Sequence, residues 1–103
     1  MLMTHTTLVK KYLHLTQTVL PDIARNKNWP IHNDHCFQRV VLDTVCQCSW
    51  YEKIPSPAYK HLSYQQALAA VNLCEQIMNN EVNLTALNAA SKRYRRKQRS
   101  FDF

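Results

Sequence analysis

Glycine is absent from all 103 positions of the chain. Loops that cradle phosphates, like the turns of dinucleotide-binding folds, need glycine where the backbone approaches a ligand or takes a positive φ angle. The absence therefore argues against the enzyme classes that bind nucleotides through such loops. Turns in this chain have to be built from Asn, Asp, Ser and Pro instead.

Long apolar runs are also missing. No segment reaches the unbroken apolar length of a membrane-spanning helix, and residues 1–21 lack the apolar core and the cleavage site of a signal peptide. We therefore expect a cytoplasmic protein with no membrane partner. Cysteines normally stay reduced in the cytoplasm. The four cysteines are then expected to pack as small hydrophobic side chains; they are Cys36, Cys46, Cys48 and Cys74.

Apolar residues make up 46% of the chain and recur at helical spacing along most of its length. This pattern is typical of a folded protein, and no segment alternates with the period of a strand. We predict an all-α fold, a single compact domain of about four helices. The helices are expected at about residues 6–20, from 33 or 34 to 48, from 63 to 78, and from 83 into the basic residues that follow.

Capping residues mark three of these helix starts. Asn33 or Asp34 can cap the second helix, and Asn83 the fourth. Ser63 and Gln66 have the spacing of a capping box at the start of the third. The proline-containing segment 49–62 is predicted to be an irregular connection, and Pro21 is expected to kink the first helix or restart a short turn. Phe37, Val41, Leu68, Val71 and Leu87 are expected among the buried residues.

Positive charge is concentrated at the C-terminal end, in the segment SKRYRRKQRS. Residues 1–90 carry a net charge of +1, whereas residues 91–103 carry +5. We therefore divide the chain into a helical domain, residues 1–90, and a basic C-terminal extension of the last helix, residues 91–103. Two or three basic residues would complement the helix dipole, so six are more than capping requires.

Clustered Lys and Arg side chains neutralise phosphates and release counterions. We therefore favour a small binding protein over an enzyme, and expect it to contact DNA or RNA through this exposed basic helix. Tyr94 would either anchor the helix to the core or stack on a base. An acidic protein partner is the alternative. The predicted nucleic-acid-binding residues are Lys92, Arg93, Tyr94, Arg95, Arg96, Lys97 and Arg99.

A second group of polar residues lies in HNDHCFQR and PAYKHL. His35, Arg39 and Asp43 share one helical face, which is expected to be a solvated stripe with one weak ion pair. If the two segments come together instead, they would form the site of a small enzyme or ligand-binding protein around His35, Arg39 and His61. The residues of this candidate polar site are His32, His35, Cys36, Arg39, Asp43, Tyr59 and His61.

Metal and cofactor sites are not expected. The two cysteines of CQC would point about 200° apart on a helix, so they could not easily share one ion. His35 and Cys36 are adjacent, and neighbouring helical residues point about 100° apart, which places His35 poorly as a base for the thiol. No motif in the chain indicates a bound cofactor.

Residues 28–97 resemble a group of small, largely uncharacterised bacterial proteins. The motifs that carry the resemblance are W-P at Trp29, H-C-F-x-R from His35 to Arg39, L-D at Asp43 and P-A-Y-K-H-L from Pro57. Some members of that group are labelled acetyltransferase-like. The acetyltransferase fold, however, relies on a mixed sheet and on a glycine-bearing loop for coenzyme A, and this sequence has neither feature. The resemblance therefore supplies no catalytic residues.

Overall fold

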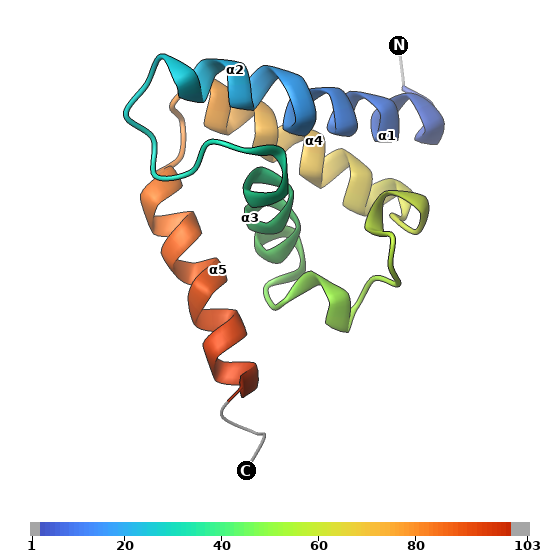
Figure 1. The fold of residues 1–103 in the computed structure, drawn as a ribbon. Coiled ribbons are helices and arrows are strands. Elements are labelled where there is room, and N and C mark those ends of the chain that lie inside the picture. Colours follow the sequence, from blue (N-terminus) through green and yellow to red (C-terminus); the bar gives the residue numbers. More distant parts are fainter. Residues whose placement is uncertain (1–2, 100–103) are drawn as a thin grey trace.

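Helices account for nearly all regular structure in the computed structural model, which describes the backbone of residues 3–99 and the side chains of residues 3–96. Within that range no strand occurs, so the predicted all-α class is confirmed (Figure 1). None of the described helices is long and apolar enough to cross a membrane. The elements are α1 (His5–His14), the π-helix η1 (Leu15–Val19), α2 (Leu20–Arg25), α3 (Asp34–Cys46), the short 3₁₀ turns η2 (Trp50–Glu52) and η3 (Ala58–Lys60), α4 (Tyr64–Met78) and α5 (Leu84–Arg99).

The first three elements follow one another without a break, so the predicted first helix is longer than expected. Pro21 lacks a backbone N–H and cannot bond to the carbonyl four residues earlier. The chain accommodates it with a π-helical turn, in which the Leu20 N–H bonds to the Leu15 carbonyl, and Pro21 then occupies the first turn of α2. The helix therefore continues to Arg25 instead of ending at the proline.

The predicted caps are confirmed. The Asn33 side chain accepts a backbone N–H from the first turn of α3, and the Asn83 side chain does the same for α5. Ser63 and Gln66 form the reciprocal capping box of α4. These side chains satisfy N–H groups that have no partner inside the helix. The helix starts of α3, α4 and α5 are therefore encoded locally.

Because the chain has no glycine, other residues take the left-handed conformation, and there are two of them in the described part of the chain. Gln47 has φ 59° just after α3, and Asn80 has φ 61° just after α4. Asn tolerates this conformation because its short side chain can bond locally. Gln is a less usual choice, so the prediction that polar turn residues replace glycine holds for Asn80 and missed Gln47.

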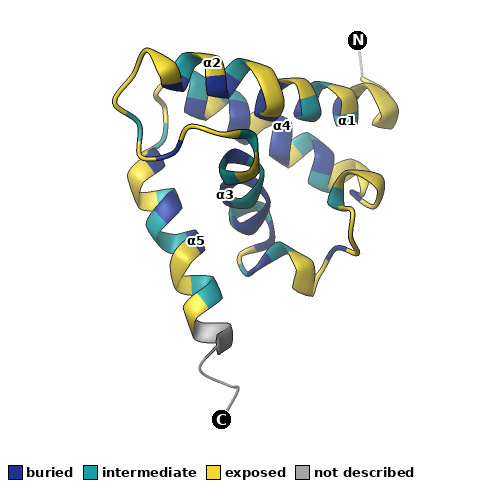
Figure 2. Ribbon diagram, in the orientation of Figure 1, coloured by how far each residue is buried: buried dark blue, intermediate teal, exposed yellow. Residues whose placement is uncertain are grey.

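The core lies where α1, α3 and α4 meet (Figures 1 and 2). α1 packs along α4, α3 crosses beneath them, and α5 leans against α3 with its C-terminal end pointing away from α1. Phe37, Val41 and Val71 are buried as predicted. Leu68 and Leu87 are only partly buried against the edge of the core, so their predicted full burial is wrong.

The Phe37→Ala variant tests this core. The Phe37 side chain is 0% exposed and its ring meets that of Trp29 edge-on at 6.0 Å. Truncation removes a buried ring and leaves a cavity, so we expect the free energy of unfolding to fall by about 3–5 kcal/mol in urea titrations. A loss below about 1 kcal/mol would contradict the burial of Phe37.

Candidate functional site

A buried carboxylate joins α3 to α5. Asp43 is 0% exposed, although it lies on the helical face that was expected to be solvated. Ser91 Oγ donates to Asp43 Oδ2 at 2.6 Å, and the Arg95 guanidinium donates to both carboxylate oxygens at 3.1 and 3.3 Å. The Trp50 backbone N–H also donates to Oδ1, at 2.9 Å. Four donors therefore replace the water that this charge loses on burial.

Arg39 extends these contacts along the helix pair. Its guanidinium donates to Ser91 Oγ and to Asn88 Oδ1, both at 2.8 Å. Arg39, Asp43, Asn88, Ser91 and Arg95 together are called the α3–α5 polar network below. Its members bring α5 against the polar side of α3.

The network corrects the expected solvated stripe. Of the three residues on that face, only His35 remains exposed, with 90% of its side chain accessible, and it lies 3.9 Å from a carboxylate oxygen of Asp34. Arg39 and Asp43 are bonded to α5. The periodicity placed the three residues on one face correctly but did not show that another helix covers most of it.

The basic helix divides into two sides. Arg95 was expected to be exposed, but it is paired with Asp43 and its guanidinium carbon lies 5.3 Å from the centre of the Tyr51 ring. Lys92, Arg93 and Arg96 are exposed and make no hydrogen bond or ion pair with any described residue. Tyr94 is half-buried. The side chains of Lys97 and Arg99 lie outside the described residues, although the α5 backbone extends through both positions.

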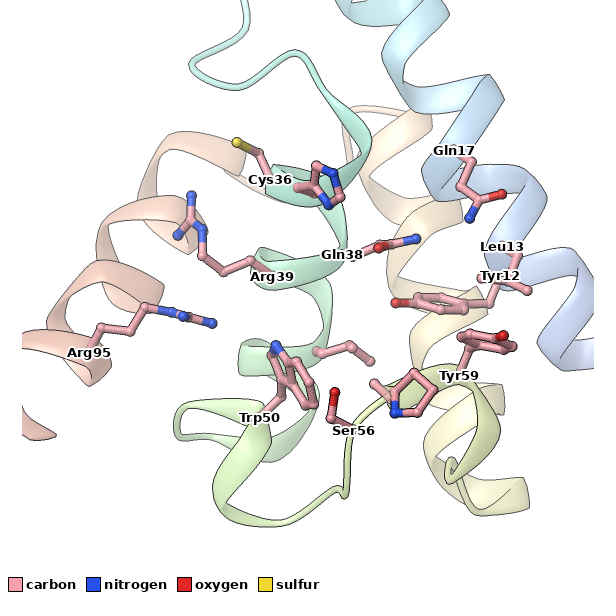
Figure 3. Close-up of a pocket in the computed structure, with 14 residues that line it drawn as sticks. Tyr12, Leu13, Gln17, Cys36, Gln38, Arg39, Trp50, Ser56, Tyr59 and Arg95 are labelled. Atoms are coloured by element: carbon pink, nitrogen blue, oxygen red, sulfur yellow. The ribbon is translucent and has the colours of Figure 1, made fainter.

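A cavity of about 650 Å³ opens between α1, α3, the proline-containing connection and α5 (Figure 3). His35, Cys36, Arg39 and Tyr59 of the candidate polar site line it, so HNDHCFQR and PAYKHL do meet.

The other three members of the candidate polar site do not line this cavity. Asp43 lies behind Arg95, and His32 and His61 are exposed elsewhere. The expected grouping of His61 with His35 and Arg39 around one cavity is therefore not found.

Several lining residues were not predicted as part of a site. They are Tyr12, Gln17, Gln38, Trp50 and Arg95. Arg95 and Gln38 come from helical positions that local patterns cannot bring together, and the periodicity assigned Tyr12 to the apolar core. Tyr12 is indeed 2% exposed, yet its hydroxyl makes no hydrogen bond with any described residue. Burial, reinforced by the nearby Cys74 thiol, raises the pKa of Tyr12 well above its usual value, so the hydroxyl keeps its proton.

All four cysteines are free thiols, and burial makes three of them less reactive. Burial raises the pKa of Cys74 to about 12, with a further contribution from the Glu75 carboxylate. Burial also raises the pKa of Cys46 and of Cys48. A raised pKa lowers the thiolate fraction, which is the reactive form. Among the side chains of residues 3–96, no three His, Cys, Asp or Glu groups gather where they could hold a metal ion.

No protein-family model, no curated protein and no solved structure matches the chain. The chemistry of the site therefore has to be argued from its own geometry. The site offers two guanidinium groups, three cationic side chains on α5 and the Tyr12 phenol, and the last four have no hydrogen-bond or ion-pair partner among the described residues. Such groups bind anions and hydrogen-bond acceptors.

The Asp43→Asn variant tests the α3–α5 polar network. Asn keeps the size of the side chain but removes its charge. It also replaces one acceptor oxygen with an NH₂ group, which cannot accept a hydrogen bond from Arg95 or Ser91. Breaking a buried ion pair in this way should lower the free energy of unfolding by about 3–5 kcal/mol in urea titrations.

The matched control is Asp34→Asn, on the same helix. Asp34 is partly exposed in the first turn of α3, so its loss should cost about 1 kcal/mol or less. Equal losses for the two variants would show that Asp43 is not a buried structural charge.

Proposed function

We propose that the protein is a small cytoplasmic nucleic-acid-binding protein, and that α5 contacts the phosphates of DNA or RNA. One observation carries the proposal. Lys92, Arg93 and Arg96 are exposed on α5 and no described residue neutralises them. A cluster of unpaired cations on one helix attracts phosphates and releases their counterions on binding.

The position of Arg95 strengthens this proposal. Arg95 forms an ion pair with the buried Asp43 and so serves the stability of the fold, which distinguishes it from the exposed cations of α5. Lys92, Arg93 and Arg96 lie on two adjacent turns of α5 and are exposed, whereas Arg95 is bonded to Asp43. Their charge has no structural partner among the described residues, which supports a partner outside the chain.

Salt dependence is the first test. Each phosphate contact should contribute about 0.7–0.9 to the slope of log affinity against log salt concentration. Fluorescence anisotropy with labelled single-stranded and duplex DNA and RNA would measure this slope. The triple variant Lys92→Gln, Arg93→Gln, Arg96→Gln should weaken binding to all sequences alike and reduce the slope by about 2–3 units. Its unfolding free energy should stay within about 1 kcal/mol of the parent.

A matched triple variant separates location from net charge. Lys10→Gln, Lys27→Gln, Lys60→Gln removes the same three charges from exposed positions outside α5. It should leave most of the affinity and the slope intact. If both triple variants weaken binding equally, the α5 proposal fails. If the parent protein ignores DNA and RNA at low salt, it fails as well, and an acidic protein becomes the better candidate partner.

A further inference from the structure

The cavity has features that the nucleic-acid proposal does not use. A volume of about 650 Å³ lies within the range of about 300–1,000 Å³ that is usual for small-molecule sites. The indole of Trp50 and the phenol of Tyr59 line it, and Leu42 contributes an apolar surface. The cavity therefore offers aromatic and apolar surface for a ring.

One side of the cavity is positively charged. Arg39 and Arg95 lie on the α5 side, and none of the described lining residues is acidic (Figure 3). Asp43 neutralises one of the two guanidinium charges from behind, so one positive charge remains. Each guanidinium uses two of its five N–H groups for described protein partners, which leaves donors for a ligand.

The opposite side holds the most informative group. The Tyr12 side chain is almost completely buried, and Figure 3 shows its hydroxyl pointing from α1 into the cavity. Among the described residues Ser49 Oγ is the one buried side-chain polar atom without a partner, so the Tyr12 hydroxyl oxygen, unlike its ring, is accessible from the cavity. Since no described residue bonds to it, the hydroxyl is available as a donor to whatever occupies the cavity.

We propose that this cavity binds a planar organic anion, an aromatic or heteroaromatic ring that bears one carboxylate or phosphate. The anionic group lies beside Arg39 and Arg95, the ring packs between Trp50 and Tyr59, and the Tyr12 hydroxyl donates to an acceptor of the ligand. The proposal goes beyond nucleic-acid binding and does not depend on it, because the exposed cations of α5 do not line the cavity.

Isothermal titration calorimetry with four probes tests the ligand class. Adenosine 5′-monophosphate and 2-naphthoate carry the two anionic groups, and adenosine and 2-naphthamide are their neutral counterparts. We expect at least one anion to bind with a dissociation constant between about 1 mM and 10 μM, and its neutral counterpart at least about tenfold more weakly. Binding of only one anion supports the site and identifies the anionic group. The absence of binding, or equal binding of charged and neutral probes, overturns the proposal.

The Tyr12→Phe variant tests the location. It removes only a hydroxyl that no described residue bonds to, so the melting temperature should stay nearly the same while affinity for the bound anion falls about tenfold. Tyr64→Phe is the control, because Tyr64 is exposed and its hydroxyl bonds to the Met3 carbonyl outside the cavity. Unchanged affinity in Tyr12→Phe would place any binding elsewhere.

Thiol protection gives a second measurement of location. Cys36 lines the cavity and Cys48 does not, and both are partly buried. A saturating anion should slow alkylation of Cys36 by iodoacetamide relative to the ligand-free protein. Cys48, whose raised pKa makes it react more slowly, should keep the rate that it has without ligand. Equal effects on both thiols would contradict the site. The Lys92→Gln, Arg93→Gln, Arg96→Gln variant should bind the anion as the parent does, so this test can fail or succeed separately from nucleic-acid binding.

Discussion

A single carboxylate inside the protein constrains how its last helix can lie. Burying an unpaired Asp43 would cost several kcal/mol, so the fold requires donors around it. α5 supplies three of the four donors, one from Ser91 and two from Arg95, and the Trp50 backbone at the start of η2 supplies the fourth. The position of α5 and the path of the connection after α3 are therefore both tied to the same charge. A buried charge also restricts how the helices can pack, because few arrangements of α3 and α5 provide all of its hydrogen-bond donors.

The division of α5 and the shape of the cavity follow from that arrangement. Arg95 is bonded to Asp43, whereas Lys92, Arg93 and Arg96 of the same helix are exposed. Arg95 and Trp50 also form part of the cavity lining, so the group that fixes the helix is shared with the proposed ligand site. An anionic ligand beside Arg39 and Arg95 would bind the guanidinium N–H groups that Asp43, Ser91 and Asn88 leave unused, or would compete with Asp43 for those of Arg95. The α3–α5 polar network thus positions the helix that carries the exposed cations and also supplies two residues of the cavity lining, Arg39 and Arg95, although neither proposed activity requires the other.

Local features of the sequence were sufficient for the starts of α3, α4 and α5, although they did not show that the first helix continues past Pro21 to Arg25. Asn33 and Ser63 act through neighbouring backbone groups, and Phe37 lies on an apolar face whose spacing is visible in the chain. Asp43 and Tyr12 could not be predicted in the same way. The partners of Asp43 are 48 and 52 residues further along the chain, and helical spacing does not say which helix will cover a polar face. Whether the hydroxyl of a buried tyrosine ring meets a protein partner or a cavity depends on the tertiary contacts around it, which no local pattern reports.

The central claim is that two adjacent arginines of α5 have opposite roles, and paired single variants test it most directly. Unfolding free energy and nucleic-acid affinity would be measured for both Arg95→Gln and Arg96→Gln. Arg95→Gln should lower the unfolding free energy by about 2 kcal/mol or more, because it leaves Asp43 buried without its ion pair. Arg96→Gln should change stability by less than about 0.5 kcal/mol and remove about one phosphate contact from the salt slope. Equal effects of the two variants on both quantities would contradict the account.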